Sequence, residues 1–78
     1  MARPPSTLHI LAEMVANVVQ IPVASGDAVE AGDTVVLLES MKMEIPVLAE
    51  RRGTVSAVRV SVGDVVQEGD VLVSLDPS

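Results

Sequence analysis

The sequence predicts an all-β domain, a small antiparallel sandwich or flattened barrel of eight short strands. Three observations predict this class: valine dominates the apolar residues, the chain is one unit written twice, and each unit contains two Gly-Asp pairs. Valine favours strands because its branched side chain packs well on a pleated surface. Short strands separated by turns at regular spacing are typical of sandwiches and barrels.

The duplication is the strongest of these signals. A shift of 37 residues aligns residues 8–40 with residues 45–77, with 12 identities in 33 positions and both Gly-Asp pairs in register. Residues 8–19 alone have apolar residues at near-helical spacing. Their counterpart contains Pro46 and Gly53, which interrupt helices. Because equivalent copies should share a conformation, both segments are predicted to be strands.

Four strands are predicted in each copy, within a domain that covers residues 8–76. Residues 1–7, with two prolines, are expected to be a flexible N-terminal tail. Glycine in each Gly-Asp pair is expected to take a positive φ, and the aspartate to bond nearby backbone amides. The alternation of Val58, Val60 and Val62 predicts that these three side chains face inward. The expected strands cover about residues 8–13, 16–23, 28–30, 35–39, 45–50, 54–60, 65–67 and 71–75.

Composition excludes several classes of function. The net charge of −6 argues against nucleic acid and anionic membrane surfaces as partners, because both need a basic footprint. No apolar run approaches the roughly 20 residues of a membrane-spanning helix. The absence of cysteine excludes disulfides and thiolate chemistry. We therefore expect a cytoplasmic protein.

Lys42 is the only lysine, and it lies between two methionines in the stretch LLESMKMEIP, residues 37–46. The 37-residue shift puts this stretch at the joint between the two copies. The hairpin that carries Lys42 is therefore expected to project from the end of the domain opposite both termini. Met41 and Met43 are apolar residues where a turn is normally polar. They are either packing residues at strand ends or an adaptable contact surface for partners.

The stretch ESMKMEIP, with GTVSAVRVSVGDVVQEGDVLVSL after it, closely resembles the biotinyl domain of biotin-dependent carboxylases. It resembles lipoyl domains of 2-oxoacid dehydrogenases more distantly. The resemblance spans about residues 8–76 and implies a barrel-sandwich hybrid, a flattened barrel of two four-stranded antiparallel sheets with quasi-twofold symmetry. Ser40 stands where the family most often has alanine. The first copy has no insertion like the thumb of some family members, so a thumbless domain is expected.

The resemblance also implies a function. Lys42 would be biotinylated by a biotin protein ligase, with Met41 and Met43 as flanking recognition residues and covalent biotin as the cofactor. The domain would be a biotin carboxyl carrier protein, a non-catalytic subunit without catalytic residues. It would shuttle carboxyl groups from a biotin carboxylase to a carboxyltransferase, as in an acetyl-CoA or other acyl-CoA carboxylase.

Two other functions remain open at this point. A lipoyl carrier would use the same fold and the same lysine, although lipoyl domains more often have Asp-Lys-Ala than Met-Lys-Met. An interaction module would leave the lysine unmodified. A metal site is not expected, because His9 has no clustered ligands and the four aspartates of the Gly-Asp pairs repeat as turn residues.

Overall fold

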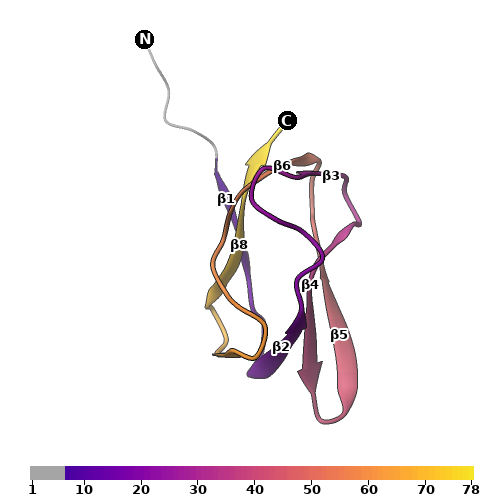
Figure 1. Cartoon of the computed structure of the whole chain (residues 1–78), viewed down its shortest axis with the longest axis vertical. Helices are drawn as coiled ribbons and strands as arrows, with labels where there is room; N and C mark the ends of the chain where they lie inside the picture. Colours follow the sequence, from indigo (N-terminus) through magenta and orange to yellow (C-terminus); the bar gives the residue numbers. More distant parts are fainter. Residues whose placement is uncertain (1–6) are drawn as a thin grey trace.

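Eight strands make up the described part of the chain, residues 7–78 of the computed structural model (Figure 1). This confirms the all-strand prediction, including the strands predicted in place of a helix over residues 8–19. Within these residues there is no helix that is long and apolar enough to cross a membrane. The strands are β1 (Leu8–Leu11), β2 (Ala16–Gln20), β3 (Ala28–Val29), β4 (Thr34–Ser40), β5 (Met43–Leu48), β6 (Gly53–Val58), β7 (Val65–Val66) and β8 (Val71–Pro77).

The strands form two four-stranded antiparallel sheets whose orders are themselves duplicated. One sheet has the order β1-β8-β6-β3, and the other has the order β5-β4-β2-β7. Adding 37 to the residue numbers converts β1 to β4 into β5 to β8, and so converts each sheet order into the other. The quasi-twofold symmetry is confirmed. Residues 28–29 and 34–40 map onto β7 and β8 without an extra segment, so the domain is thumbless.

The Gly-Asp turns are built in the same way four times. In each turn the aspartate carboxylate accepts a hydrogen bond from the backbone N–H three residues earlier, as between Ala24 and Asp27 (2.9 Å) and between Ser61 and Asp64 (2.8 Å). The same pattern recurs at Asp33 and Asp70. The glycine before each aspartate has a positive φ, between 92° and 97°. Both sequence expectations for these turns are confirmed.

The turns also tie the two halves together. The Gly26 N–H donates to the Val55 carbonyl at 2.7 Å, and the equivalent Gly63 N–H donates to the Val18 carbonyl at 2.9 Å. Each half therefore closes its turns on strands of the other half. Neither half could satisfy these backbone groups alone.

The core is aliphatic and takes equivalent residues from both copies. Buried pairs related by the shift include Val18 with Val55 and Leu38 with Leu75. Ser74 is the only buried polar residue in the described chain, and its hydroxyl lies 3.1 Å from His9 Nδ1. The further buried pairs are Ala12 with Ala49, Val29 with Val66, Val35 with Leu72, and Val36 with Val73.

The predicted strand ends were less accurate. β6 ends at Val58, and Val62 is 63% exposed, so the prediction that Val62 faces inward was wrong. Val62 lies outside the sheet, in the turn that it forms with Gly63, so its side chain does not reach the core. Residues 1–6 of the expected tail lie outside the described residues. The Thr7 hydroxyl donates to the Asp76 carboxylate at 3.0 Å.

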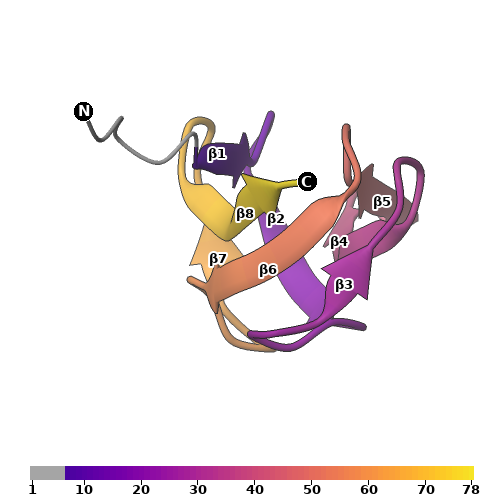
Figure 2. The ribbon, with the colours of Figure 1, turned by 90° about the horizontal axis from the view of Figure 1, so that it is seen from above.

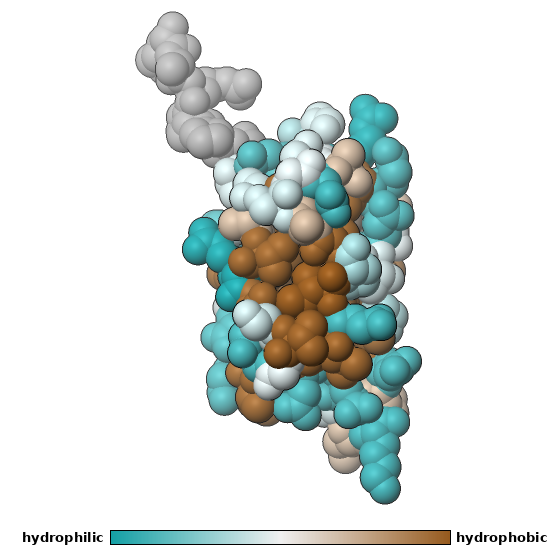
Figure 3. All heavy atoms as spheres, viewed as in Figure 1, coloured by the Kyte–Doolittle hydropathy of each residue, from teal (hydrophilic) through white to brown (hydrophobic). Residues whose placement is uncertain are grey.

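The two copies give the domain two distinct faces and two distinct ends. The β4–β5 hairpin projects at the bottom of Figure 1, while the start of β1 and the C-terminus lie at the top, as the duplication predicted. In Figure 2, β1 and β5 lie on one side, and the loops that follow β2 and β6 lie on the other. The face that carries these two loops is the one seen in Figure 3, and apolar side chains gather in its middle. These loops carry Ile21, Val23 and Val60, which pack against the core.

Candidate functional site

The turn that carries Lys42 is as short as a hairpin turn can be. Ser40 pairs with Met43 across β4 and β5, so Met41 and Lys42 alone connect the two strands. Their φ angles are 53° and 65°, and they are the only non-glycine residues in the described chain with a positive φ. Two consecutive positive φ angles define the tight turn that normally carries Asn-Gly. The backbone therefore holds Lys42 in a strained and fixed position.

The side chains of this turn are exposed. Met41 is 91% exposed and Met43 is 63% exposed, and Lys42 is exposed between them. This exposure excludes core packing for both methionines. The turn presents a primary amine between two apolar, flexible side chains in water. Such methionines adapt easily to a partner surface.

Two carboxylates lie behind the turn. Glu39 and Glu44 are directly opposite each other in the β4–β5 register, and both are exposed. Like charges in directly opposite positions destabilise a pair of strands. The equivalent of Glu39 in the second copy is Asp76, whose carboxylate instead accepts the hydroxyl of Thr7. The acidic pair is thus specific to the Lys42 hairpin.

The hairpin tip is separate from a groove on the described surface. A groove of about 680 Å³ lies between β1 and β5, and no residue from 39 to 44 lines it. Nucleophilic catalysis by Ser40 and Lys42 would need an enclosed site, and neither residue lines the groove. The tip can therefore present an amine to another protein's active site. The structure places the predicted site residues Met41, Lys42 and Met43 together at this exposed tip.

The groove is the feature that sequence reasoning missed. Its polar lining includes Glu13, Glu50 and Glu68, beside apolar residues of β1 and β5. A signal was present in the duplication, because Leu11 and Glu13 are identical to their counterparts Leu48 and Glu50. Sequence alone did not show that these two segments face one another. No group of three metal-ligating side chains occurs among residues 7–78.

Curated proteins similar to this chain share about half of it. Biotinylated protein TB7.3 of Mycobacterium tuberculosis is 64% identical over 38 residues, which are 49% of this chain and 54% of the relative. The biotin/lipoyl attachment protein of Bacillus subtilis is 49% identical over 35 residues, which are 45% of this chain and 48% of the relative. The matched region therefore spans about half the length of these relatives.

Solved structures match nearly the whole chain. A single-chain, multi-domain long-chain acyl-CoA carboxylase superimposes with a TM-score of 0.90 and 28% identity, covering 100% of this chain and 8% of the carboxylase. Kluyveromyces lactis urea carboxylase superimposes with a TM-score of 0.86 and 32% identity, covering 96% of this chain and 7% of that enzyme. In both, the similar part is a small piece of a large enzyme.

The comparison with protein families covers most of the domain. The sequence model of the family described as biotin-requiring enzyme matches residues 9–75, which include both copies of the repeat and the hairpin between them. The architecture agrees with the fold that the resemblance of the MKM stretch implied. The chain belongs to the biotin-requiring enzyme family.

Proposed function

We propose that Lys42 is the site of covalent biotin attachment and that the domain is a biotin carboxyl carrier. One observation carries the proposal most directly. The only lysine of the chain lies at the tip of a two-residue turn, exposed and flanked by exposed methionines. A modifying enzyme can reach this amine without moving any part of the core. Family membership and the names of the curated relatives support biotin as the group attached.

Attachment requires the chain to supply only a nucleophile and its position. The Lys42 ammonium gives a proton to a base of the biotin protein ligase, and its Nζ attacks the carboxyl carbon of activated biotin. An amide bond would form as the bond from that carbon to the phosphate oxygen of the biotinyl-adenylate breaks. The nitrogen would lose its second proton to solvent, and AMP would leave. Met41 and Met43 offer the ligase apolar contacts on both sides of the nucleophile. The left-handed turn fixes the root of the lysine side chain.

The exposed position of the lysine supports the carrier role. Biotin attached at Lys42 would supply a ureido nitrogen able to carry a carboxyl group from a biotin carboxylase to a carboxyltransferase. The chain itself contributes the tether, and tethering raises the effective concentration of the group at both active sites. Structural likeness to parts of an acyl-CoA carboxylase and a urea carboxylase supports carboxylase partners. We propose an acyl-CoA carboxylase as the assembly served, with the domain working in the cytoplasm.

A second candidate function is a lipoyl carrier. The Bacillus subtilis relative is named a biotin/lipoyl attachment protein, so its name leaves both groups open. A lipoyl group would form the same amide at Lys42, and the exposed turn would present it equally well. The Met-Lys-Met sequence favours biotin over lipoate.

Intact-mass analysis of the chain distinguishes these functions. The chain is incubated separately with a biotin protein ligase and biotin, and with a lipoate ligase and lipoate, each with ATP. We expect one biotinyl increment, located at Lys42 by peptide mapping. The Lys42→Arg variant keeps the charge and should gain no increment. A lipoyl increment alone would favour the second candidate, and no adduct with either ligase would exclude both carriers.

A further inference from the structure

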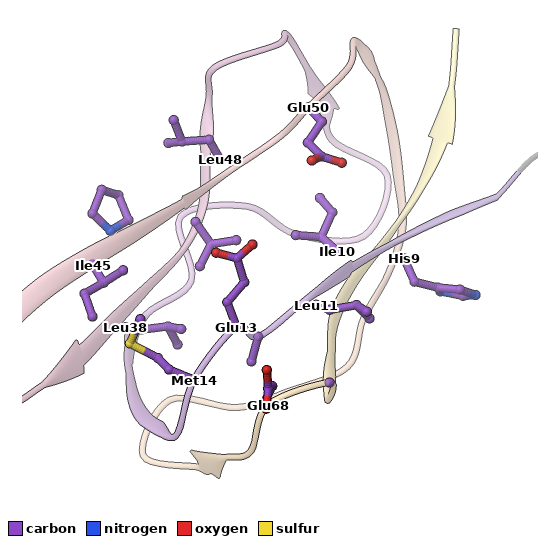
Figure 4. Close-up of a pocket in the computed structure, with 14 residues that line it drawn as sticks. His9, Ile10, Leu11, Glu13, Met14, Leu38, Ile45, Leu48, Glu50 and Glu68 are labelled. Carbon is purple, nitrogen blue, oxygen red and sulfur yellow. The ribbon is translucent and has the colours of Figure 1, made fainter.

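The groove lies between β1 and β5, and each of these is an edge strand of its sheet (Figure 4). No strand of the described chain pairs with the outer edge of either. An outer edge presents backbone N–H and C=O groups that can pair with an added strand. A partner's strand could therefore occupy this groove by pairing with the free edge of β1 or β5.

The two edges differ at one pair of equivalent positions. His9 of β1 pairs with Ser74, and its counterpart Pro46 of β5 pairs with Leu37, the counterpart of Ser74. Proline has no N–H and is accommodated in an edge strand where its nitrogen faces away from the neighbouring strand. Pro46 therefore removes a donor from the outer edge of β5, while His9 keeps a donor at the equivalent place on β1. An added strand therefore finds one more backbone donor on the edge of β1 than on the edge of β5.

The side chains of the groove favour an apolar partner surface. Leu11 is 45% exposed, its counterpart Leu48 is 46% exposed, and Met14 is 40% exposed. All three line the groove, together with Ile10 and Ile45. These large apolar side chains are half-exposed on both walls of the groove. Covering them with a partner's apolar side chain lowers the free energy of the complex. In an extended strand, every second residue would point at these side chains.

The charged residues of the groove favour lysine or arginine in the partner's strand. Glu13, Glu50 and Glu68 are exposed and line the groove, whereas no lysine or arginine of residues 7–78 does so. Glu13 lies in the middle of Figure 4, and Glu50 and Glu68 lie on opposite sides of it in that view. Glu68 has no acidic counterpart, since the equivalent residue is Ala31. The negative charge is therefore spread along the groove, which favours a basic segment in it.

We infer that this groove binds an extended, basic segment of a partner protein, which adds to the free edge of β1. Apolar residues of the segment would contact Leu11 and Leu48, and intervening lysines or arginines would meet the three glutamates. A second copy of this chain is a poor occupant, because it would bring the same glutamates to the same groove. Ile45, the groove residue nearest the tip along β5, lies three residues from Lys42, roughly 10 Å along the strand. A bound segment would leave Lys42 free, and the inference does not depend on modification of Lys42.

Titration of the unmodified, ¹⁵N-labelled chain with short capped peptides tests the inference by NMR. The probe is a peptide of alternating lysine and valine. One control replaces lysine with glutamate, and the other carries N-methyl groups on the backbone. We expect the probe alone to shift the amide signals of Leu8–Leu11 and of Glu13, Glu50 and Glu68. Equal binding of the glutamate peptide, or shifts centred elsewhere, would overturn the inference.

Variants locate the contact. His9→Pro copies the natural Pro46 onto β1 and should abolish binding while circular dichroism shows an intact sheet. If this variant does not fold, Glu13→Lys combined with Glu68→Lys should weaken binding about threefold to tenfold. The matched control is Glu30→Lys, an exposed glutamate outside the groove, which should bind the probe as the parent does. Unchanged binding in the double variant, or dimerisation through β1, would contradict a basic partner segment.

Discussion

Ser40 and Met43 pair directly across the β4–β5 hairpin, so the turn between them consists of Met41 and Lys42 alone. Both turn residues have left-handed φ angles, 53° and 65°. Left-handed conformations cost about 1–2 kcal/mol per non-glycine residue, because Cβ approaches the following carbonyl oxygen. Asn-Gly satisfies such a turn with little strain. The domain therefore holds conformational strain at the residue proposed to carry biotin.

Replacing the turn by Asn-Gly should stabilise the domain. The double variant Met41→Asn with Lys42→Gly is expected to raise the free energy of unfolding by about 1–2 kcal/mol, since it relieves both left-handed residues. Urea denaturation followed by circular dichroism measures the change. The same variant should accept no biotin, because it lacks the only lysine.

The control for this prediction is Lys42→Ala, which removes the same amine but keeps a Cβ in the left-handed position. Its free energy of unfolding should stay within about 0.5 kcal/mol of the parent's. If the double variant is no more stable than Lys42→Ala, the turn is not strained.

Gly53 should be the least replaceable glycine of the chain. A Cβ at this position would overlap the Asp76 carbonyl oxygen and would lie 2.9 Å from the Pro77 Cα. Backbone atoms of β8 cannot move aside without disturbing the β6–β8 pairing, so Gly53→Ala should destabilise the domain by about 3 kcal/mol. Gly26→Ala is the comparison, because its φ is +97° but its Cβ would meet open space. It should cost only about 1 kcal/mol in urea denaturation; equal losses would refute the steric explanation.

The four turn aspartates should contribute equally to stability. Each carboxylate accepts one backbone hydrogen bond of 2.8 or 2.9 Å in an exposed turn. Single replacement by alanine should therefore lower the free energy of unfolding by about 1 kcal/mol at any of the four positions. Replacement by asparagine, which keeps an acceptor oxygen, should lower it less. A loss confined to one copy of the repeat would show that the quasi-twofold symmetry does not extend to the energetics. The four residues are Asp27, Asp33, Asp64 and Asp70.

The sequence predicted the turns, the strands and the position of Lys42, because these depend on local residue chemistry and recur in both copies of the repeat. Gly26 and Gly63 marked equivalent turns because only glycine takes their φ without strain. Pro46 and Gly53 in the second copy excluded a helix for residues 8–19 in the first. The position of Lys42 at the end opposite the termini followed from the same repeat, since the joint between the copies is equivalent to the chain ends.

The features that depend on long-range pairing could not be predicted in the same way. No local pattern shows that β8 lies between β1 and β6, or that β1 and β5 face each other across a groove. Val62 continued an alternation that the turn at Gly63 interrupts. The contrast between His9 and Pro46 is visible in the aligned copies, but its meaning depends on both strands being sheet edges.

Met41 should matter for recognition and not for folding. Its side chain is 91% exposed, so Met41→Ala removes no packed surface and should change the free energy of unfolding by less than about 0.5 kcal/mol. Loss of its apolar contact with a biotin protein ligase should lower kcat/KM for biotin attachment about fivefold to tenfold, which corresponds to roughly 1 kcal/mol of lost contact. Ligase assays with varied concentrations of the chain, combined with urea denaturation, measure both quantities.

Met14→Ala is the matched control, because Met14 is 40% exposed and lines the groove, which no residue from 39 to 44 of the hairpin tip lines. It should lower the free energy of unfolding and leave the ligase reaction unchanged. The two methionines thus separate the two explanations for an apolar residue on the surface. A Met41→Ala variant that loses stability but keeps the parent's kcat/KM would assign Met41 to the fold, and would remove the reason for placing a ligase contact at this turn.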